Sequence, residues 1–203
     1  YQVAFTGQKT YNGVAILSKL PLADVVKNNP RFEDEQQRVI SATIDGMRIV
    51  CAYIPNGQEV GSDKYQYKLR WMAQLRAHVA ALSSPDEPVV VTGDFNIAPT
   101  DIDVHDPRKF VGATHVSEAE RAELAALCDW GMVDLFRQHH PDEKLYSWWD
   151  YRAGDFHQGR GLRIDLVLGT QSVAERYTFS IVDRNARKGQ SPSDHAPVIV
   201  DLA

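Results

Sequence analysis

The sequence predicts an α/β fold built as one domain over residues 1–203. Strand-like and helix-like segments are intermixed along the chain, without a repeat, a low-complexity tract or a linker. Three consecutive valines at residues 89–91 are typical of a central strand that is covered on both faces. Because 43% of the 203 residues are hydrophobic, the chain can bury a substantial core.

The first half of the chain predicts a hairpin followed by a helix. Residues 1–17 are strand-like, and residues 38–54 are two β-rich runs around Asp45-Gly46, a pair that can take the positive φ angles of a tight turn. From Ser62 onward, apolar residues follow helical spacing at Tyr65, Leu69, Met72, Leu75, Val79 and Leu82. We expect this face, with Trp71 near it, to pack on a sheet.

The second half predicts a central strand, a helix and three late strands. Pro88 stands before the valine run, and Gly93 lets the backbone turn tightly as it leaves the sheet. Ser117 and Glu120 form a capping box at the start of a helix that Gly131 can end. The late strands are predicted at residues 161–169, 176–182 and 195–202.

The net charge of −5 argues against a generic basic binder of nucleic acid. It is compatible with an enzyme whose carboxylates are concentrated around a cation. Basic side chains do gather locally, in two groups: Arg152, Arg160 and Arg163, then Arg184, Arg187 and Lys188. Taken alone, either group is more often a solvated loop than an edge that contacts phosphate.

The two cysteines are too few for a disulfide framework. Cys51 falls in a strand-like run and Cys128 in a helix-like one, so both are predicted to be small core residues of a protein in a reducing compartment. We therefore predict a cytoplasmic protein without a membrane span.

Asp94 and Asn96 follow the valine run and are expected at a rim of the sheet. Ligands of α/β proteins bind in the crevice beyond strand ends, and alternation would point both side chains to one side with Phe95 turned into the packing. A carboxylate beside a neutral amide can hold a hard cation and hydrogen-bond a phosphate oxygen. A loop in which Asp94 and Asn96 cap their own backbone is an equally open interpretation.

An acid and an imidazole stand at a second rim position. Asp194 and His195 come directly before the last predicted strand, while Asp165 lies inside an otherwise apolar strand, where an unpaired carboxylate is costly. We expect Asp165 to accept a hydrogen bond from His195, which fixes the tautomer and raises the basicity of the imidazole, with Asp194 beside a metal ion. The alternative is that Asp165 is a structural acid satisfied by a backbone amide or by Arg163.

Six segments carry a resemblance to a known family: YNGVAILSK, YIPNG, GDFNIAPTDIDVHDP, YSWWDYR, GLRIDLVL and SPSDHAPV. In this order, over nearly the whole chain, they resemble the bacterial exonuclease III family of abasic-site endonucleases, within the endonuclease/exonuclease/phosphatase superfamily. GDFN and SDH alone indicate only the superfamily, whereas GDFNIAPTDIDVHDP and YSWWDYR are more specific to its DNA-repair branch. The resemblance implies a layered α/β sandwich of two packed mixed β-sheets flanked by helices.

The resemblance also implies catalytic roles. Tyr53 matches the tyrosine whose hydroxyl contacts the scissile phosphate, and Asp94 matches the acid that orients or deprotonates the attacking water. Asn96 matches the residue that stabilises the pentacovalent transition state. Asp165 and His195 match the family's Asp-His pair, in which the imidazole donates to a phosphate oxygen.

Two further sets of residues are implied in the same way. The metal site, for Mg²⁺ with Mn²⁺ as a second candidate, would involve Asp94, Asn96 and Asp194. The apolar pocket that receives a base-free sugar would be formed by Trp148, Leu162 and Ile164.

The expected function is Mg²⁺-dependent phosphodiester hydrolysis in DNA repair. The resemblance implies a monomer that cleaves duplex DNA 5′ to abasic sites and acts at 3′ ends as a 3′→5′ exonuclease and 3′-phosphatase. Family members begin with further residues, including a strand that ends in Asn and another that ends in the Glu that is the principal metal ligand. We therefore expect an N-terminally truncated domain. The alternatives are a phosphoesterase acting on lipid or sugar phosphates, and an inactive DNA-binding remnant that lacks this Glu.

Overall fold

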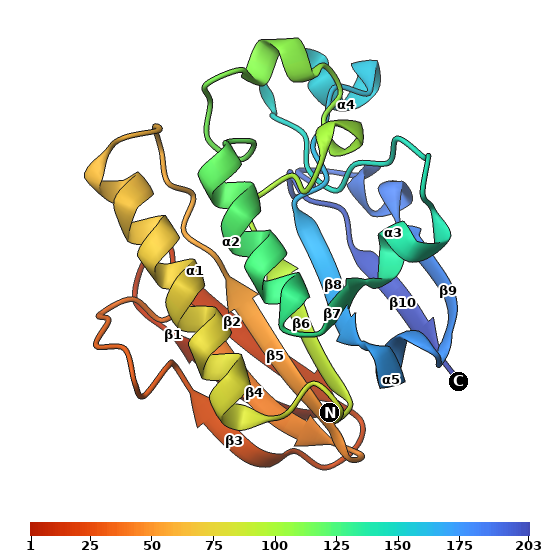
Figure 1. Ribbon diagram of the computed structural model, residues 1–203. Coiled ribbons are helices and arrows are strands. Elements are labelled where there is room, and N and C mark those ends of the chain that lie inside the picture. Colours follow the sequence, from red (N-terminus) through yellow and green to blue (C-terminus); the bar gives the residue numbers. More distant parts are fainter.

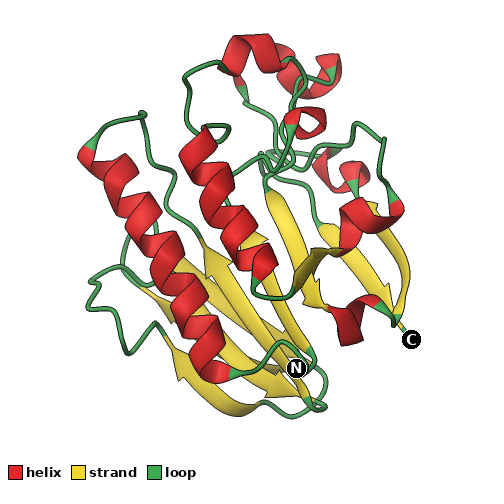
Figure 2. Cartoon of the chain, viewed as in Figure 1, coloured by secondary structure: helices red, strands yellow, loops and turns green.

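The computed structural model describes residues 1–203 and arranges them in layers around a six-stranded mixed sheet (Figure 1). The strands of this sheet, in spatial order, are β3 (Ala23–Lys27), β4 (Val39–Ile44), β5 (Met47–Tyr53), β6 (Val89–Asp94), β8 (Asp165–Thr170) and β7 (Met132–Asp134). Helices α1 (Asp63–Leu82) and α2 (Glu118–Asp129) cover one face, as Figure 2 shows. The predicted α/β class is confirmed.

The other face of the sheet carries two separate hairpins. One pairs β1 (Gln2–Gly7) with β2 (Gly13–Ser18), and the other pairs β9 (Tyr177–Val182) with β10 (Val198–Leu202). The first packs against β4 and β5, and the second lies at the β8 end of the sheet (Figure 1). The second layer therefore differs in detail from the predicted mixed sheet. It consists of two antiparallel pairs, because no ladder within residues 1–203 joins one hairpin to the other.

Short helical segments connect these layers. They are α3 (Leu135–His139), α4 (Asp155–Gln158), α5 (Gln171–Ala174) and the 3-10 turns η1 (Asp101–Asp103), η2 (Pro107–Phe110), η3 (Arg152–Gly154) and η4 (Arg184–Arg187). None of the helices combines the length and the apolar character that crossing a membrane requires.

The predicted local signals fold as expected. Asp45 and Gly46 take φ angles of 49° and 76° in the turn between β4 and β5. Ser62 caps α1, and Trp71 is 4% exposed within the main core. The Ser117–Glu120 capping box opens α2.

The central strand β6 is buried on both faces, as its valines predict. Val89 and Val91 belong to the main core under α1 and α2, whereas Val90 packs with Leu135 and Val173 on the opposite side. Gly93 near the end of the strand has a φ of 137°, and a Cβ added there would lie 2.0 Å from the carbonyl oxygen of Ala52. The close approach of β5 therefore requires glycine at this position.

Replacing Gly93 by alanine should destabilise the protein by more than ~4 kcal/mol, because the new methyl group meets backbone in addition to the positive φ. Gly46→Ala is the matched control. It also has a positive φ, but no atom lies within 4 Å of the added Cβ, so we expect a loss of about 1–2 kcal/mol. Urea denaturation measures both, and equal losses would contradict the steric account.

Candidate active site

Strand pairing brings three of the predicted residues to one end of the sheet. The antiparallel register of β6 and β8 sets Asp94 opposite Asp165, and the parallel register of β5 and β6 sets Tyr53 beside Asp94. The guanidinium of Arg38 lies 4.6 Å from the centre of the Tyr53 ring. These contacts fix a rim at which two carboxylates and a phenol are neighbours.

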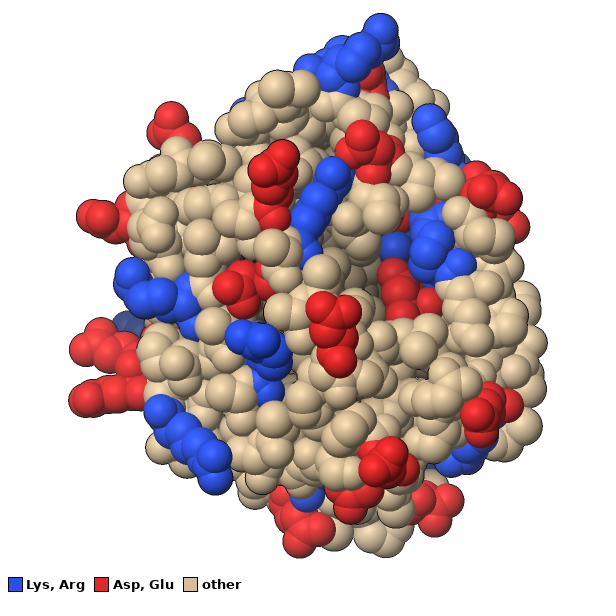
Figure 3. Space-filling model, viewed as in Figure 1, with Lys and Arg blue, Asp and Glu red and all other residues tan.

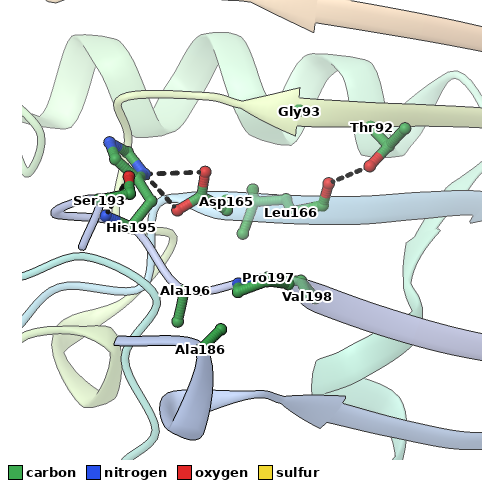
Figure 4. Close-up of a pocket in the computed structure, with 10 residues that line it drawn as sticks. All are labelled: Thr92, Gly93, Asp165, Leu166, Ala186, Ser193, His195, Ala196, Pro197 and Val198. Carbon is green, nitrogen blue, oxygen red and sulfur yellow. Dashed lines mark hydrogen bonds and ion pairs between the residues drawn. The ribbon is translucent and has the colours of Figure 1, made fainter. Parts of the chain in front are cut away.

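His195 reaches this rim from the segment before β10. Its Nδ1 lies 3.0 and 2.9 Å from the two carboxylate oxygens of Asp165, and Figure 4 shows the other ring nitrogen pointing away from that acid. The pairing that the sequence predicts is therefore present. Arg163, one of the alternative partners of Asp165, is excluded, because it binds Asp103 at 2.6 Å and Asp134 at 2.7 Å instead.

Asp94 and Asn96 are held by each other. The backbone N–H of Asn96 donates to Asp94 Oδ1 and its side-chain amide donates to Asp94 Oδ2, both at 2.9 Å. The same amide donates to the carbonyl of Ile54 at 3.1 Å. Asn96 has a φ of 51°, so a left-handed bend brings the two side chains together and strand alternation does not. Phe95 is fully buried in the core, as expected.

The contacts of Asp94 show the backbone cap that the sequence left open as one interpretation, at a position that also faces other charged groups of the rim. Its carboxylate caps its own backbone, and it also faces the Asp165–His195 pair closely enough for their charges to act on it. Burial and the negative charge of Asp165 raise the pKa of Asp94 to about 7, against the opposing effect of His195 and Lys68. Asp94 can therefore exchange a proton near neutral pH.

The surroundings of His195 favour its charged form, whereas those of Asp94 favour its neutral form. Burial acts to lower the pKa of its imidazole, but the hydrogen bond and charge of Asp165, together with the charges of Asp94 and Asp194, raise it to about 9. At neutral pH the ring is protonated. It can act as a positively charged hydrogen-bond donor toward an anion.

The Asp165–His195 pair lines a cavity of about 470 Å³ (Figure 4). Its walls also include Thr92, Gly93 and Ser193. The cavity is large enough for a phosphate with part of its attached sugar. An anion in this cavity would face the protonated imidazole of His195.

Asp194 and the predicted pocket residues lie next to His195. The indole N–H of Trp148 donates to Asp194 Oδ2 at 3.0 Å, and the backbone of Trp148 bridges both His195 and Leu162. Leu162 and Ile164 are 1% and 2% exposed and pack in a core cluster with Trp148 against them. Of the three predicted pocket residues, only Trp148 is partly exposed; Leu162 and Ile164 lie within the packing behind it.

The predicted metal ligands do not form a complete centre. Asp94 is bound to Asn96, and Asp194 is bound to Trp148. No group of three or more histidine, cysteine or acidic side chains in residues 1–203 is arranged to hold a metal ion. The residues present do not fit a metal site on their own, so the chemistry below is derived from the side chains of the chain.

Sequence reasoning missed the group that supports Asn96 from below. Lys68 on α1 is fully buried, and its ammonium donates to the carbonyl of Asn96 at 2.6 Å and to Glu120 at 2.5 Å. His115 donates from Nδ1 to the same carbonyl at 2.6 Å. Burial and the charge of Lys68 lower the pKa of His115 to about 4, so its imidazole is neutral. Helical spacing was the available signal for the burial of Lys68, because this residue lies between Tyr65 and Met72 on the buried face of α1.

Comparisons with known proteins agree with this geometry. A model of the Endonuclease/Exonuclease/phosphatase family matches residues 1–195. The chain is 33% identical to exodeoxyribonuclease III of Haemophilus influenzae over 211 residues, which cover 98% of this chain and 79% of that protein. It is also similar to two solved structures, each covering 100% of this chain and 79% of the other. One is a 3′ phosphatase from Neisseria bound to product DNA hairpin (40% identity, TM-score 0.97), and the other is an AP endonuclease from Archaeoglobus fulgidus (35%, 0.96).

Replacing Asp165 by asparagine should lower the pKa of His195 from about 9, because the hydrogen bond and charge of Asp165 that oppose burial are lost, whereas the charges of Asp94 and Asp194 remain. An NMR titration of the imidazole in EDTA measures this shift. Asp129→Asn, at the exposed end of α2, is the control and should leave the titration unchanged. An unshifted pKa in Asp165→Asn would show that this acid does not control His195.

Replacing Lys68 by methionine should cost about 3–5 kcal/mol of unfolding free energy, because Glu120 stays buried without its cation. The exposed Lys64 on the same helix offers the control Lys64→Met, which should change stability by no more than about 0.5 kcal/mol. Chemical denaturation compares the two. Similar small losses would mean that the Lys68–Glu120 pair does not support the site.

Proposed function

Because the chain belongs to the exonuclease III and AP endonuclease family of the endonuclease/exonuclease/phosphatase superfamily, we propose that it hydrolyses phosphodiester bonds of damaged duplex DNA. The proposed activities are cleavage 5′ to abasic sites, 3′→5′ exonuclease action and removal of 3′ phosphates. The observation that carries the proposal is the meeting of Asp94, Asp165 and His195 at one rim beside a cavity.

The scissile phosphate would lie in this cavity against His195. A phosphodiester is an anion, and attack by water adds negative charge to its oxygens in the transition state. The imidazolium of His195 would donate to one of these oxygens, where a fixed donor contributes on the order of 3 kcal/mol. Asp165 keeps His195 protonated and holds its orientation.

Asp94 would orient the attacking water and accept its proton as the water oxygen bonds to phosphorus and the bond from phosphorus to the leaving 3′ oxygen breaks. The protonated Asp94 could then return this proton to the leaving oxygen. A pKa of about 7 suits this role, because the carboxylate is then available as a base and is not so weak that it cannot take the proton. The two amide hydrogens of Asn96 already serve Ile54 and Asp94. In this arrangement Asn96 acts by holding Asp94, and it would reach the phosphate only by exchanging one of these bonds.

Tyr53 and the pocket would define the substrate. Tyr53 stands next to Asp94 in the sheet register, so its hydroxyl is proposed to contact the scissile phosphate. Trp148, with Leu162 and Ile164 behind it, is proposed to receive the sugar of a flipped nucleotide that has no base. A missing base lowers the cost of unstacking by a few kcal/mol, which favours an abasic site over an intact nucleotide.

Enzymes of this family are typically metal-dependent. A divalent cation supplies neutralising charge at the phosphate when it is bound. We propose that Asp94, Asn96 and Asp194 would contribute oxygen ligands to Mg²⁺, or Mn²⁺, and that water and the substrate phosphate would supply the rest, because these residues do not complete a centre on their own. A monomer that acts on duplex DNA in the cytoplasm is proposed on the same basis.

Nicking of a duplex with a single abasic analogue tests the proposal, with Mg²⁺ and with EDTA. We expect cleavage 5′ to the lesion that EDTA abolishes, and losses of about 10²–10³-fold in kcat for His195→Gln and for Asp94→Asn. Asp129→Asn should retain full activity. Hydrolysis of inositol or sugar phosphates without nicking of the duplex, or wild-type rates in both site variants, would contradict the proposal.

A further inference from the structure

Arg187 occupies an unusual environment near the site. It is 6% exposed, and its guanidinium carbon lies 4.7 Å from the ring centre of Phe156, 5.5 Å from Trp149 and 5.6 Å from Tyr151. Its Nε and Nη1 are buried without a hydrogen-bond partner. The aromatic rings therefore hold the cation in place, but they leave its hydrogen bonds unmade.

No carboxylate compensates this charge. Two acids, Asp150 and Asp155, line the same cavity, but each is already paired with its own arginine, Arg152 at 2.9 Å and Arg160 at 2.5 Å. Neither Arg187 nor the neighbouring Lys188 forms an ion pair. By contrast, the buried Arg163 has two carboxylate partners. A buried cation without a partner is costly, so an anion from outside the chain is the missing group.

The cavity beside Arg187 can admit such an anion. It measures about 410 Å³, lies between α4 and η4, and includes Lys188 and His157 in its wall. It also includes Pro192, whose carbonyl accepts a hydrogen bond from the Tyr151 hydroxyl at 2.8 Å, two residues before Asp194. The backbone N–H of Trp149 donates to the carbonyl of Asp194 at 3.0 Å. The cavity therefore lies beside the candidate active site: Arg187 and Pro192 in its wall directly adjoin Ala186 and Ser193, which line the active-site cavity.

Basic side chains also lie near this part of the molecule. Figure 3 shows a group of lysine and arginine side chains at the top, where Figure 1 places α4, while acidic and further basic side chains are scattered over the rest of this face. Arg184 adds a second guanidinium that stacks on Trp149 and Phe156 at 5.3 and 5.2 Å. A strand of nucleic acid that reaches His195 would pass this basic region.

We propose that the cavity at Arg187 and Lys188 binds a backbone phosphate of the DNA strand next to the scissile phosphate. This inference rests on the proposed function, because it takes duplex DNA as the ligand. A guanidinium stacked on aromatic rings is already ordered, and its N–H groups suit phosphate oxygens. The bound phosphate would position the strand and would carry no sequence information.

The salt dependence of DNA binding tests this subsite. Fluorescence anisotropy in EDTA gives the affinity for a duplex with one abasic analogue over a range of salt concentrations, without cleavage. Each phosphate contact contributes about 0.9 to the slope of log K against log salt, so Arg187→Met and Lys188→Gln should each lower the slope by about 1. Lys188 is exposed, so its variant remains informative if Arg187→Met lowers the Tm.

Lys27→Gln is the charge-matched control. Lys27 is exposed on β3, at the end of the molecule opposite α4 (Figure 1), and its loss should leave the slope unchanged. Unchanged slopes in both test variants, or an equal decrease in Lys27→Gln, would overturn the subsite. If the wild-type chain still nicks the duplex, the proposed function would stand. A decreased slope without nicking would support the subsite and count against the proposed function. Failure of the wild-type chain to bind the duplex would contradict both.

Discussion

The pairing of β6 with β8 is the constraint on which the site depends, because its register places Asp94 directly opposite Asp165. Two carboxylates held close together at a partly buried rim repel each other, and neighbouring cationic groups offset this repulsion. His195 donates a hydrogen bond to Asp165 from one side, and Lys68 provides positive charge behind Asp94 from the other. The result is a cationic donor and a weakly acidic carboxyl group side by side, which is a combination that suits the proposed hydrolysis.

The helices serve this rim as well as the core. α1 and α2 bury the apolar face of the sheet, and they also place Lys68 and Glu120 below the bend after β6. Lys68 and His115 both donate to the carbonyl of Asn96, which stabilises a left-handed backbone that asparagine tolerates better than most residues. The bend in turn holds Asn96 against Asp94. Packing of the helices is thereby linked to the orientation of one carboxylate.

Local sequence signals predicted most of the elements, whereas the support of the site depends on long-range contacts. The Asp45-Gly46 turn, the α1 stripe, the capping box of α2 and the buried β6 all follow from neighbouring residues. Asp165–His195 was predictable because a lone acid in an apolar strand requires a partner. Lys68 and Glu120 are 52 positions apart in the sequence. Because lysine side chains on helices are normally exposed to solvent, the burial of Lys68 could not be derived from helical spacing alone. The depth of Leu162 and Ile164, and the separation of the second layer into two hairpins, likewise depend on packing between distant segments.

The titration of the Asp94 carboxyl group tests most directly whether the two acids and His195 act as one unit. A ¹³C NMR titration of the protein in EDTA should give a pKa of about 7 for Asp94 in the wild type. The same titration in Asp165→Asn should give a clearly lower value, because the repulsion is gone. A wild-type value near 4, the ordinary pKa of an aspartic acid, would contradict the account, since Asp94 would then not feel its neighbour across the sheet.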